Sequence, residues 1–392
     1  MLPTDNIDLM YWMGLLIGLL GTFTGIFIAS VIYRRAFRRP VQDSYGGLIT
    51  LAGRKKEITR LQGHILTGQS SAIVSIFEED RTALLGYLSD PSNSKELYGE
   101  QADKLIFSLL DIHSLFLKNP TCKPAQFWEQ ALKPLTEEKF EPNSSLLRIY
   151  QTCQANKFDE SCLDKLIIQL KQEGWRLVLM LDRFYELLGS NLDQAQFFAT
   201  LRHLASYRSP SSLSLIISGE ISLNQFHEKT RSLGLKGSPY LNFIESGEMV
   251  LGNLSDSEVY ELLSEISFSK PECQFIQDIA GNHPHFLQLA ASALQIAKET
   301  QEKQPLEMAQ KDFYGRVKSM LNNIIHSWGL EICQAMIGLV KENKSLEFLN
   351  DELSLLEKQG FLVKNSQNQW QVSPRVLIDF IKNTKQEDLC KH

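Results

Sequence analysis

Hydrophobic positions follow two patterns along the chain. Residues 9–33, LMYWMGLLIGLLGTFTGIFIASVIY, contain no charged side chain. At about 1.5 Å per residue, a helix of this length crosses a hydrocarbon core of roughly 30 Å. Beyond residue 53 the apolar runs are shorter and alternate between strand-like and helix-like spacing. The pattern predicts one transmembrane helix over 9–33, a linker over 34–52 and then a large folded part.

Five apolar runs in the folded part predict strands, at residues 72–78, 104–112, 176–182, 212–218 and 248–254. The segments between them, such as LDKLIIQLKQEG, carry the spacing of amphipathic helices. Nearly continuous apolar strands separated by helices are typical of a parallel sheet covered on both faces. From about residue 271 the pattern is helical and closes with the ribbon GFLVKNSQNQWQVS.

The charges that flank the apolar run predict its orientation. Two aspartates precede it and four arginines follow at 34, 35, 38 and 39. The positive-inside rule then places residues 1–8 outside and the folded part in the cytoplasm, as a single-pass membrane protein. The alternative is a cleaved signal peptide, but its basic residues would precede the apolar run.

Small residues recur along the predicted span at spacings of three and four, which places them on one helix face: Gly14, Gly18, Gly21, Gly25 and Ala29. Such a face allows two helices to approach closely, so it predicts self-association. The alternative is that glycine is simply frequent in membrane helices.

Composition narrows the function classes. The chain has 392 residues, and 43% of them are hydrophobic, a composition typical of globular proteins. Its formal net charge is −6, so it has no general electrostatic attraction to nucleic acid. Its six cysteines form no Cys-x-x-Cys pair and favour free thiols in a reducing compartment, without a metal. These are Cys122, Cys153, Cys162, Cys273, Cys333 and Cys390.

Eight motifs follow one another from residue 53 onward: GRKKEITRL, RTALLGYL, FWEQALKPL, RLVLMLDRF, LRHLASY, SLIISGEISL, LGNLSDSEVYELL and IAGNHPHFLQLAASAL. Their order resembles that of the bacterial STAND-type P-loop ATPases, a branch near the AAA+ class. The resemblance implies an ATP-gated, oligomerising switch with an α/β nucleotide-binding domain over 53–254, a helical lid over 255–311 and a winged helix over 312–386.

The phosphate loop of such proteins has the pattern G-x-x-x-x-G-K-[ST], whose glycines let the backbone cradle phosphate. In this register Ser75 and Asp80 replace the glycines, Arg81 replaces the lysine and Thr82 is retained. An arginine keeps the charge but not the compact ammonium group. Arg81 and Thr82 are the candidate nucleotide contacts.

Three consecutive acids, Glu78, Glu79 and Asp80, lie in the predicted loop. A carboxylate about 5 Å from a phosphate charge costs on the order of 3 kcal/mol at an effective dielectric constant of 20. Three alternatives remain: a relic loop with solvated acids, an acidic surface that binds a partner protein, or a loop that holds nucleotide in an altered pose.

Asp182 ends the third predicted strand, where the family binds Mg²⁺ through a carboxylate, but the neighbouring acid that activates water is replaced by Arg183. If a helix begins here, Glu186 lies on the same face as Asp182 and is a candidate displaced base. The alternative for Asp182 is a helix N-cap.

GNHPHFLQ places Gly281 and Pro284 where the family packs a lid proline on adenine. His283 and His285 lack an accompanying acid or cysteine cluster, so packed histidines at a helix entry are favoured over a metal pair.

The helix before the ribbon carries Asp351, Glu352 and Glu357 against Lys358, which disfavours DNA binding and favours a winged helix that packs against protein.

Two functions therefore remain. One is a membrane-anchored pseudo-ATPase without cofactor, which is a protein-binding and self-associating scaffold and not an enzyme. The other is a signalling switch that binds ATP or ADP with Mg²⁺ and hydrolyses ATP slowly.

Overall fold

The computed structural model describes residues 51, 53–137, 144–190, 194–208, 212–232, 241–265, 268–301, 303–342 and 350–390. Residues 49–392 form one unit by their internal contacts. The predicted span 9–33, with its stripe from Gly14 to Ala29, lies outside the described residues. Among the helices that are described, none is both long and apolar enough to cross a membrane.

A five-stranded parallel sheet forms the first part of this unit. Its strands run in the order β2-β3-β4-β1-β5, so the first strand lies between the fourth and the fifth. This confirms the five predicted strands and their parallel arrangement. The bounds are β1 Ser71–Val74, β2 Leu105–Asp111, β3 Arg176–Asp182, β4 Leu213–Gly219 and β5 Glu248–Val250.

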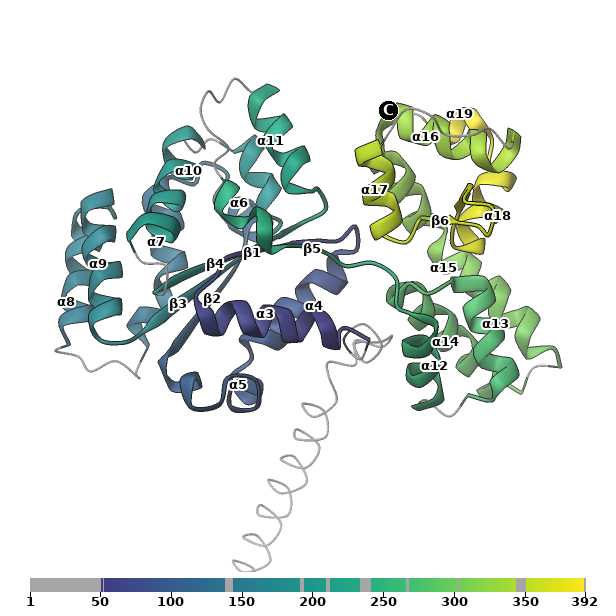
Figure 1. Ribbon diagram of the computed structural model, residues 1–392, viewed down its shortest axis with the longest axis horizontal. Coiled ribbons are helices and arrows are strands. Elements are labelled where there is room, and N and C mark those ends of the chain that lie inside the picture. Colours follow the sequence, from purple (N-terminus) through teal and green to yellow (C-terminus); the bar gives the residue numbers. More distant parts are fainter. Residues whose placement is uncertain are drawn as a thin grey trace, which may run out of the picture. The chain divides into compact units, whose positions relative to one another are not determined.

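Helices cover both faces of the sheet because its strands are apolar on both sides. One face packs on α3 Lys55–Thr67, α4 Glu78–Ser89 and α5 Pro91–Tyr98. The other packs mainly on α7 Pro124–Ala131, α9 Glu160–Gln172, α10 Gln194–Arg202 and α11 Leu223–Ser232 (Figure 1). The remaining elements are α6 Ile112–Lys118, α8 Ser145–Ala155, the 3-10 helices η1 Gly99–Lys104, η2 Lys133–Thr136, η3 Phe184–Gly189 and η5 Asn242–Gly247, and the π-helix η4 His203–Arg208.

The region after β5 is helical and has its own hydrophobic core. It ends with a small antiparallel hairpin, β6 Leu362–Lys364 and β7 Trp370–Val372, which confirms the predicted ribbon. The helices are α12 Asp256–Glu265, α13 Lys270–Ala280, α14 Pro284–Glu299, α15 Pro305–Ser327, α16 Gly329–Ile337, the π-helix η6 Gly338–Glu342, α17 Asn350–Lys358, α18 Arg375–Asn383 and α19 Gln386–Leu389.

The link from β5 to α12 passes close to the turn before the hairpin. A Cβ atom added at Gly252 would lie 1.8 Å from the carbonyl oxygen of Lys358, and one added at Gly360 would lie 2.2 Å from Asn253. Gly360 also has φ +86°, which other residues rarely adopt. Gly252 therefore lets the two backbones approach closely, and Gly360 leaves room for the side chain of Asn253.

Cys333 and Cys390 form a disulfide that joins α16 to the end of α19. The prediction of six free thiols is therefore wrong for this pair, because folding brings together two residues that are 57 positions apart. The other four cysteines, at 122, 153, 162 and 273, are free and buried.

Candidate functional site

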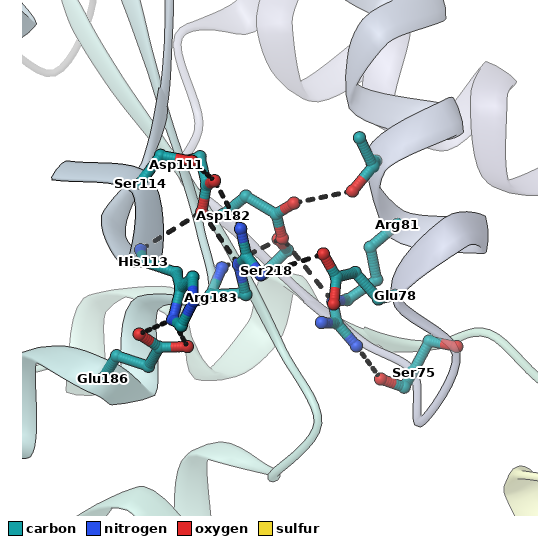
Figure 2. A network of polar contacts seen from close by, with 11 residues as sticks. Ser75, Glu78, Arg81, Asp111, His113, Ser114, Asp182, Arg183, Glu186 and Ser218 are labelled. Carbon is teal, nitrogen blue, oxygen red and sulfur yellow. Dashed lines mark hydrogen bonds and ion pairs between the residues drawn. The ribbon is translucent and has the colours of Figure 1, made fainter. Parts of the chain in front are cut away.

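The carboxyl ends of the parallel strands bring polar side chains together (Figure 2). Ser75 follows β1, Asp111 ends β2, Asp182 ends β3 and Ser218 is the penultimate residue of β4. This edge of an α/β sheet is where ligands bind in doubly wound folds.

Only three residues, Ser75 to Phe77, separate β1 from α4. The helix begins at Glu78, so the three acids form its first turn and do not lie in a loop. Acids are stable there because the N-terminal end of a helix is electropositive. In P-loop proteins the corresponding helix N-terminus faces a phosphate. Here that helix N-terminus carries carboxylates of the chain itself.

Arg81 lies buried across the strand ends, with 2% of its surface exposed. Its guanidinium donates to the carbonyl oxygen of Ser75. Its Nε lies 3.5 Å from Oδ1 of Asp182, although this contact lacks hydrogen-bond geometry. A positive group of the chain therefore lies beside the carboxylate that was predicted to hold Mg²⁺.

Asp182 is 4% exposed, and both of its oxygens are engaged. Thr82 donates to Oδ2 at 2.8 Å, Ser218 donates to Oδ1, and the backbone N–H of Arg183 donates to Oδ1 at 2.9 Å. The residue that caps the following helix η3 is Arg183 and not Asp182. Asp182 thus joins the Thr82 and β4 positions in one network instead of capping a helix.

Magnesium and nucleotide do not fit this arrangement. Asp182 has a cation 3.5 Å away and both of its oxygens already accept hydrogen bonds, while the helix end beside it carries three acids. A magnesium ion would be repelled by the guanidinium, and a phosphate would be repelled by the carboxylates.

Arg183 adopts a left-handed backbone conformation, with φ 54°. Its guanidinium binds Asp111 in a bidentate manner, with one bond of 2.8 Å from Nε, and Nη1 lies 3.0 Å from Glu78 (Figure 2). Burial alone would raise the pKa of Asp111, but the hydrogen bonds from Arg183 and Ser114 outweigh it and lower that pKa. The residue in the place of the catalytic base therefore ties β2, β3 and α4 together.

Glu186 contacts His113 of α6, with Oε2 2.9 Å from the Nδ1 atom. It belongs to the 3-10 helix η3, which does not keep the α-helical spacing from Asp182 that the sequence predicted. Among its described contacts, none joins it to Asp182, so the displaced-base arrangement is not formed.

Asp80 points into the protein, with 3% of its surface exposed. Its Oδ2 lies 3.5 Å from Nη2 of Arg54, a side chain that is itself 1% exposed and 3.3 Å from Glu57. Burial raises the pKa of Asp80, against the opposing effects of Arg54 and His285. The acidic surface predicted for a partner is therefore reduced to Glu78 and Glu79, which are exposed.

Phe77 fills the space between the sheet edge and the lid motif. Its ring lies 4.2 Å from that of His283 and 5.0 Å from that of His285, between centroids. His283 caps α14 by accepting from the N–H of His285, and burial lowers its pKa well below the usual range. Within the described residues there is no group of three metal-binding side chains, and the two histidines are packed at the start of a helix.

Gly281 and Pro284 lie on either side of this helix start. Gly281 has φ +66°, and an added Cβ would lie 2.7 Å from Pro374. Pro284 is the first residue of α14 and is buried. Gly281 and Pro284 thus pack against other parts of the chain at the start of α14.

Several residues of the site were not predicted. Each of them contacts a partner far away in the sequence: Ser218 donates to Asp182, and His113 contacts Glu186. The other two are Arg54 and Phe77. Only Arg54 had a signal, since it belongs to the GRKKE motif, but its partner Asp80 could not be deduced from spacing.

Comparisons with known proteins support the fold. No protein-family model and no curated protein matches the chain. A Walker-type ATPase of Pyrococcus abyssi is similar in structure, with TM-score 0.53 and 14% identity over 84% of this chain and 95% of its own. Two structures of the Aeropyrum pernix ORC2 protein, an ADPNP–ADP complex and an ADP form, give TM-scores of 0.45 and 0.44, with 13% identity. They cover 84% and 89% of this chain and 92% and 97% of theirs, but at these scores they carry no argument. The chain thus shares the fold of a Walker-type ATPase.

Proposed function

We propose that this protein is a membrane-anchored, STAND-like pseudo-ATPase, which keeps the P-loop fold as a protein-binding scaffold. The observation that carries the proposal is the buried guanidinium of Arg81, 3.5 Å from Asp182 and bonded to Ser75. The chain supplies its own cation at the metal position, so the fold is complete without a ligand.

Two further contacts support this proposal at separate points of the nucleotide path. Phe77 packs on His283 and His285, where a base would stack under the lid. Arg183 is bound to Asp111 and Glu78, at the position of the hydrolytic acid. Recovering hydrolysis would therefore require changes at three places.

The anchor and the quaternary state rest on the sequence. The uncharged run 9–33 and the arginines after it support a single span with the folded part in the cytoplasm, and the stripe of small residues supports self-association. The hairpin β6–β7 after α17 supports a winged helix that packs against protein. The domain boundaries at 254 and 311 belong to the same proposal.

An ATP-binding switch is the second candidate. Thr82 and Asp182 remain in contact at 2.8 Å, and this pair is the one that holds a metal in active P-loop proteins. In this alternative Arg81 would swing out when MgATP binds.

Calorimetry separates the two candidates. Residues 49–392 form a compact unit whose hydrophobic clusters are its own, so this fragment is suitable and the full chain in mild detergent is the comparison. The scaffold proposal expects no heat from ATP with Mg²⁺, and micromolar binding would refute it. The double variant Asp80→Gly, Arg81→Lys restores two positions of the phosphate-loop pattern. Binding by this variant alone would show that the two side chains exclude the nucleotide.

A further inference from the structure

An exposed groove lies between α6 and η3, beside the network of Figure 2. Its walls are mostly apolar, with Phe116, Leu117, Pro120 and Tyr185 along its length. Leu117 is 69% exposed, the largest value among the exposed large hydrophobic residues of the described chain. A leucine so exposed on a short helix, next to other apolar side chains, is typical of a surface that another molecule covers.

One end of the groove carries negative charge. Glu186 lines it together with His113, and the neighbouring network adds Asp111 and the half-exposed Glu78. Arg183 contacts both Glu78 and Asp111, but its single positive charge offsets only one of the three negative charges. These three carboxylates against one guanidinium leave this end of the groove negative, and a positively charged partner is complementary to it.

We propose that this groove binds a helix of a partner protein, one that presents an aliphatic side chain and, one turn away, a lysine or arginine. The inference rests on the proposed scaffold function and names the class of partner. Glu186 contacts His113, which lies four residues before Leu117 on α6. The acidic end of the groove therefore begins about one helical turn from the exposed leucine. A partner helix that lies along α6 can place its basic residue at the acidic end and its aliphatic residue, four positions away, against Leu117. This is the helix-in-groove mode of recognition.

The test uses the 49–392 fragment and two fluorescein-labelled synthetic helical peptides. Both peptides consist of alanine except for leucines and charged residues placed four positions apart. The charged residue is lysine in one peptide and glutamate in the other. Fluorescence anisotropy should show binding of the lysine peptide only. Leu117→Ser should weaken it about tenfold, the effect of losing one buried leucine contact. Glu186→Gln should weaken it about threefold, and the effect should shrink as salt is added.

Matched controls lie elsewhere on the surface. Leu330 is 47% exposed and Glu307 is exposed, and neither lines the groove. Leu330→Ser and Glu307→Gln should leave the affinity unchanged. Equal binding of the glutamate peptide, or equal losses in the control variants, would overturn the proposal.

Calorimetry with MgATP on the same protein keeps the two proposals separate. No nucleotide binding together with no lysine-peptide binding would overturn the groove inference alone. Micromolar nucleotide binding would refute the scaffold function, whatever the peptides do.

Discussion

Replacing Arg81 by methionine tests whether its guanidinium compensates Asp182. The two groups are 2% and 4% exposed and lie 3.5 Å apart. At an effective dielectric constant of 20, this separation corresponds to about 5 kcal/mol of attraction. Asp182 keeps its bonds from Thr82, Ser218 and a backbone N–H, so the expected loss of stability is smaller, about 3 kcal/mol. This is the low end of the range for breaking a buried ion pair.

The second half of the experiment removes the carboxylate as well. Asp182→Asn alone should also cost about 3 kcal/mol, because Arg81 is then left buried without its partner. The double variant should cost much less than the sum, with a coupling energy of about 2–3 kcal/mol. Methionine preserves most of the length of the side chain, so the cycle reports charge more than cavity formation.

Urea unfolding of the 49–392 fragment measures these differences. Circular dichroism and tryptophan fluorescence follow the unfolding transition. Arg231→Met, at an exposed position, should change stability by less than about 0.5 kcal/mol. If Arg81→Met and Asp182→Asn were additive within about 0.5 kcal/mol, Arg81 would not be compensating Asp182 and the scaffold proposal would lose its main support. Added Mg²⁺ should stabilise Arg81→Met but not the wild type, because only the variant has an uncompensated carboxylate.

Three further outcomes follow from the structure. Burial raises the pKa of Asp80 above its ordinary 3.8, so its contribution to stability is full below that value and is lost as pH rises through the folded-state pKa. Urea midpoints measured from pH 3.5 upward should show this loss in the wild type and not in Asp80→Asn. Reducing the bond between Cys333 and Cys390 should lower stability by about 2–4 kcal/mol, and Cys333→Ser should make the urea midpoint insensitive to dithiothreitol. Gly252→Ala places a Cβ 1.8 Å from a backbone carbonyl and should cost on the order of 1–3 kcal/mol. Gly63→Ala, on α3, meets nothing within 4 Å. Thermal melts of the fragment should show a lower melting temperature for Gly252→Ala and no decrease for Gly63→Ala.

The sheet could be predicted from the sequence because its strands are buried on both faces. Continuous apolar runs mark such strands directly, and all five lie within a few residues of their predicted ranges. Their spatial order, with β1 between β4 and β5, is set by long-range packing that periodicity does not record. The hairpin after α17 was visible for a similar local reason, as two short runs around a polar turn.

The site was predicted in part. Asp182 ends β3 and Thr82 lies in α4, where the sequence predicted a strand end and a helical segment. The acids were expected in a loop, although three acids in succession also suit the first turn of a helix, which is where they lie. Glu186 was misjudged because the left-handed backbone at Arg183 and the 3-10 turn after it break α-helical spacing. Its partner His113 lies 73 residues away, beyond any local signal.

The bond between Arg81 and the carbonyl of Ser75, six positions earlier, affects how well a magnesium ion could compete with Arg81 for Asp182. A ligand tied to its site by a short stretch of chain has an effective concentration in the millimolar range, and one held rigidly in place has a far higher one. A diffusible magnesium ion or magnesium–nucleotide complex must compete with a cation that dilution never removes. Under the scaffold function proposed above, changes in nucleotide level at cellular concentrations leave Asp182 paired as it is, and the protein keeps one shape whatever the energy state of the cell.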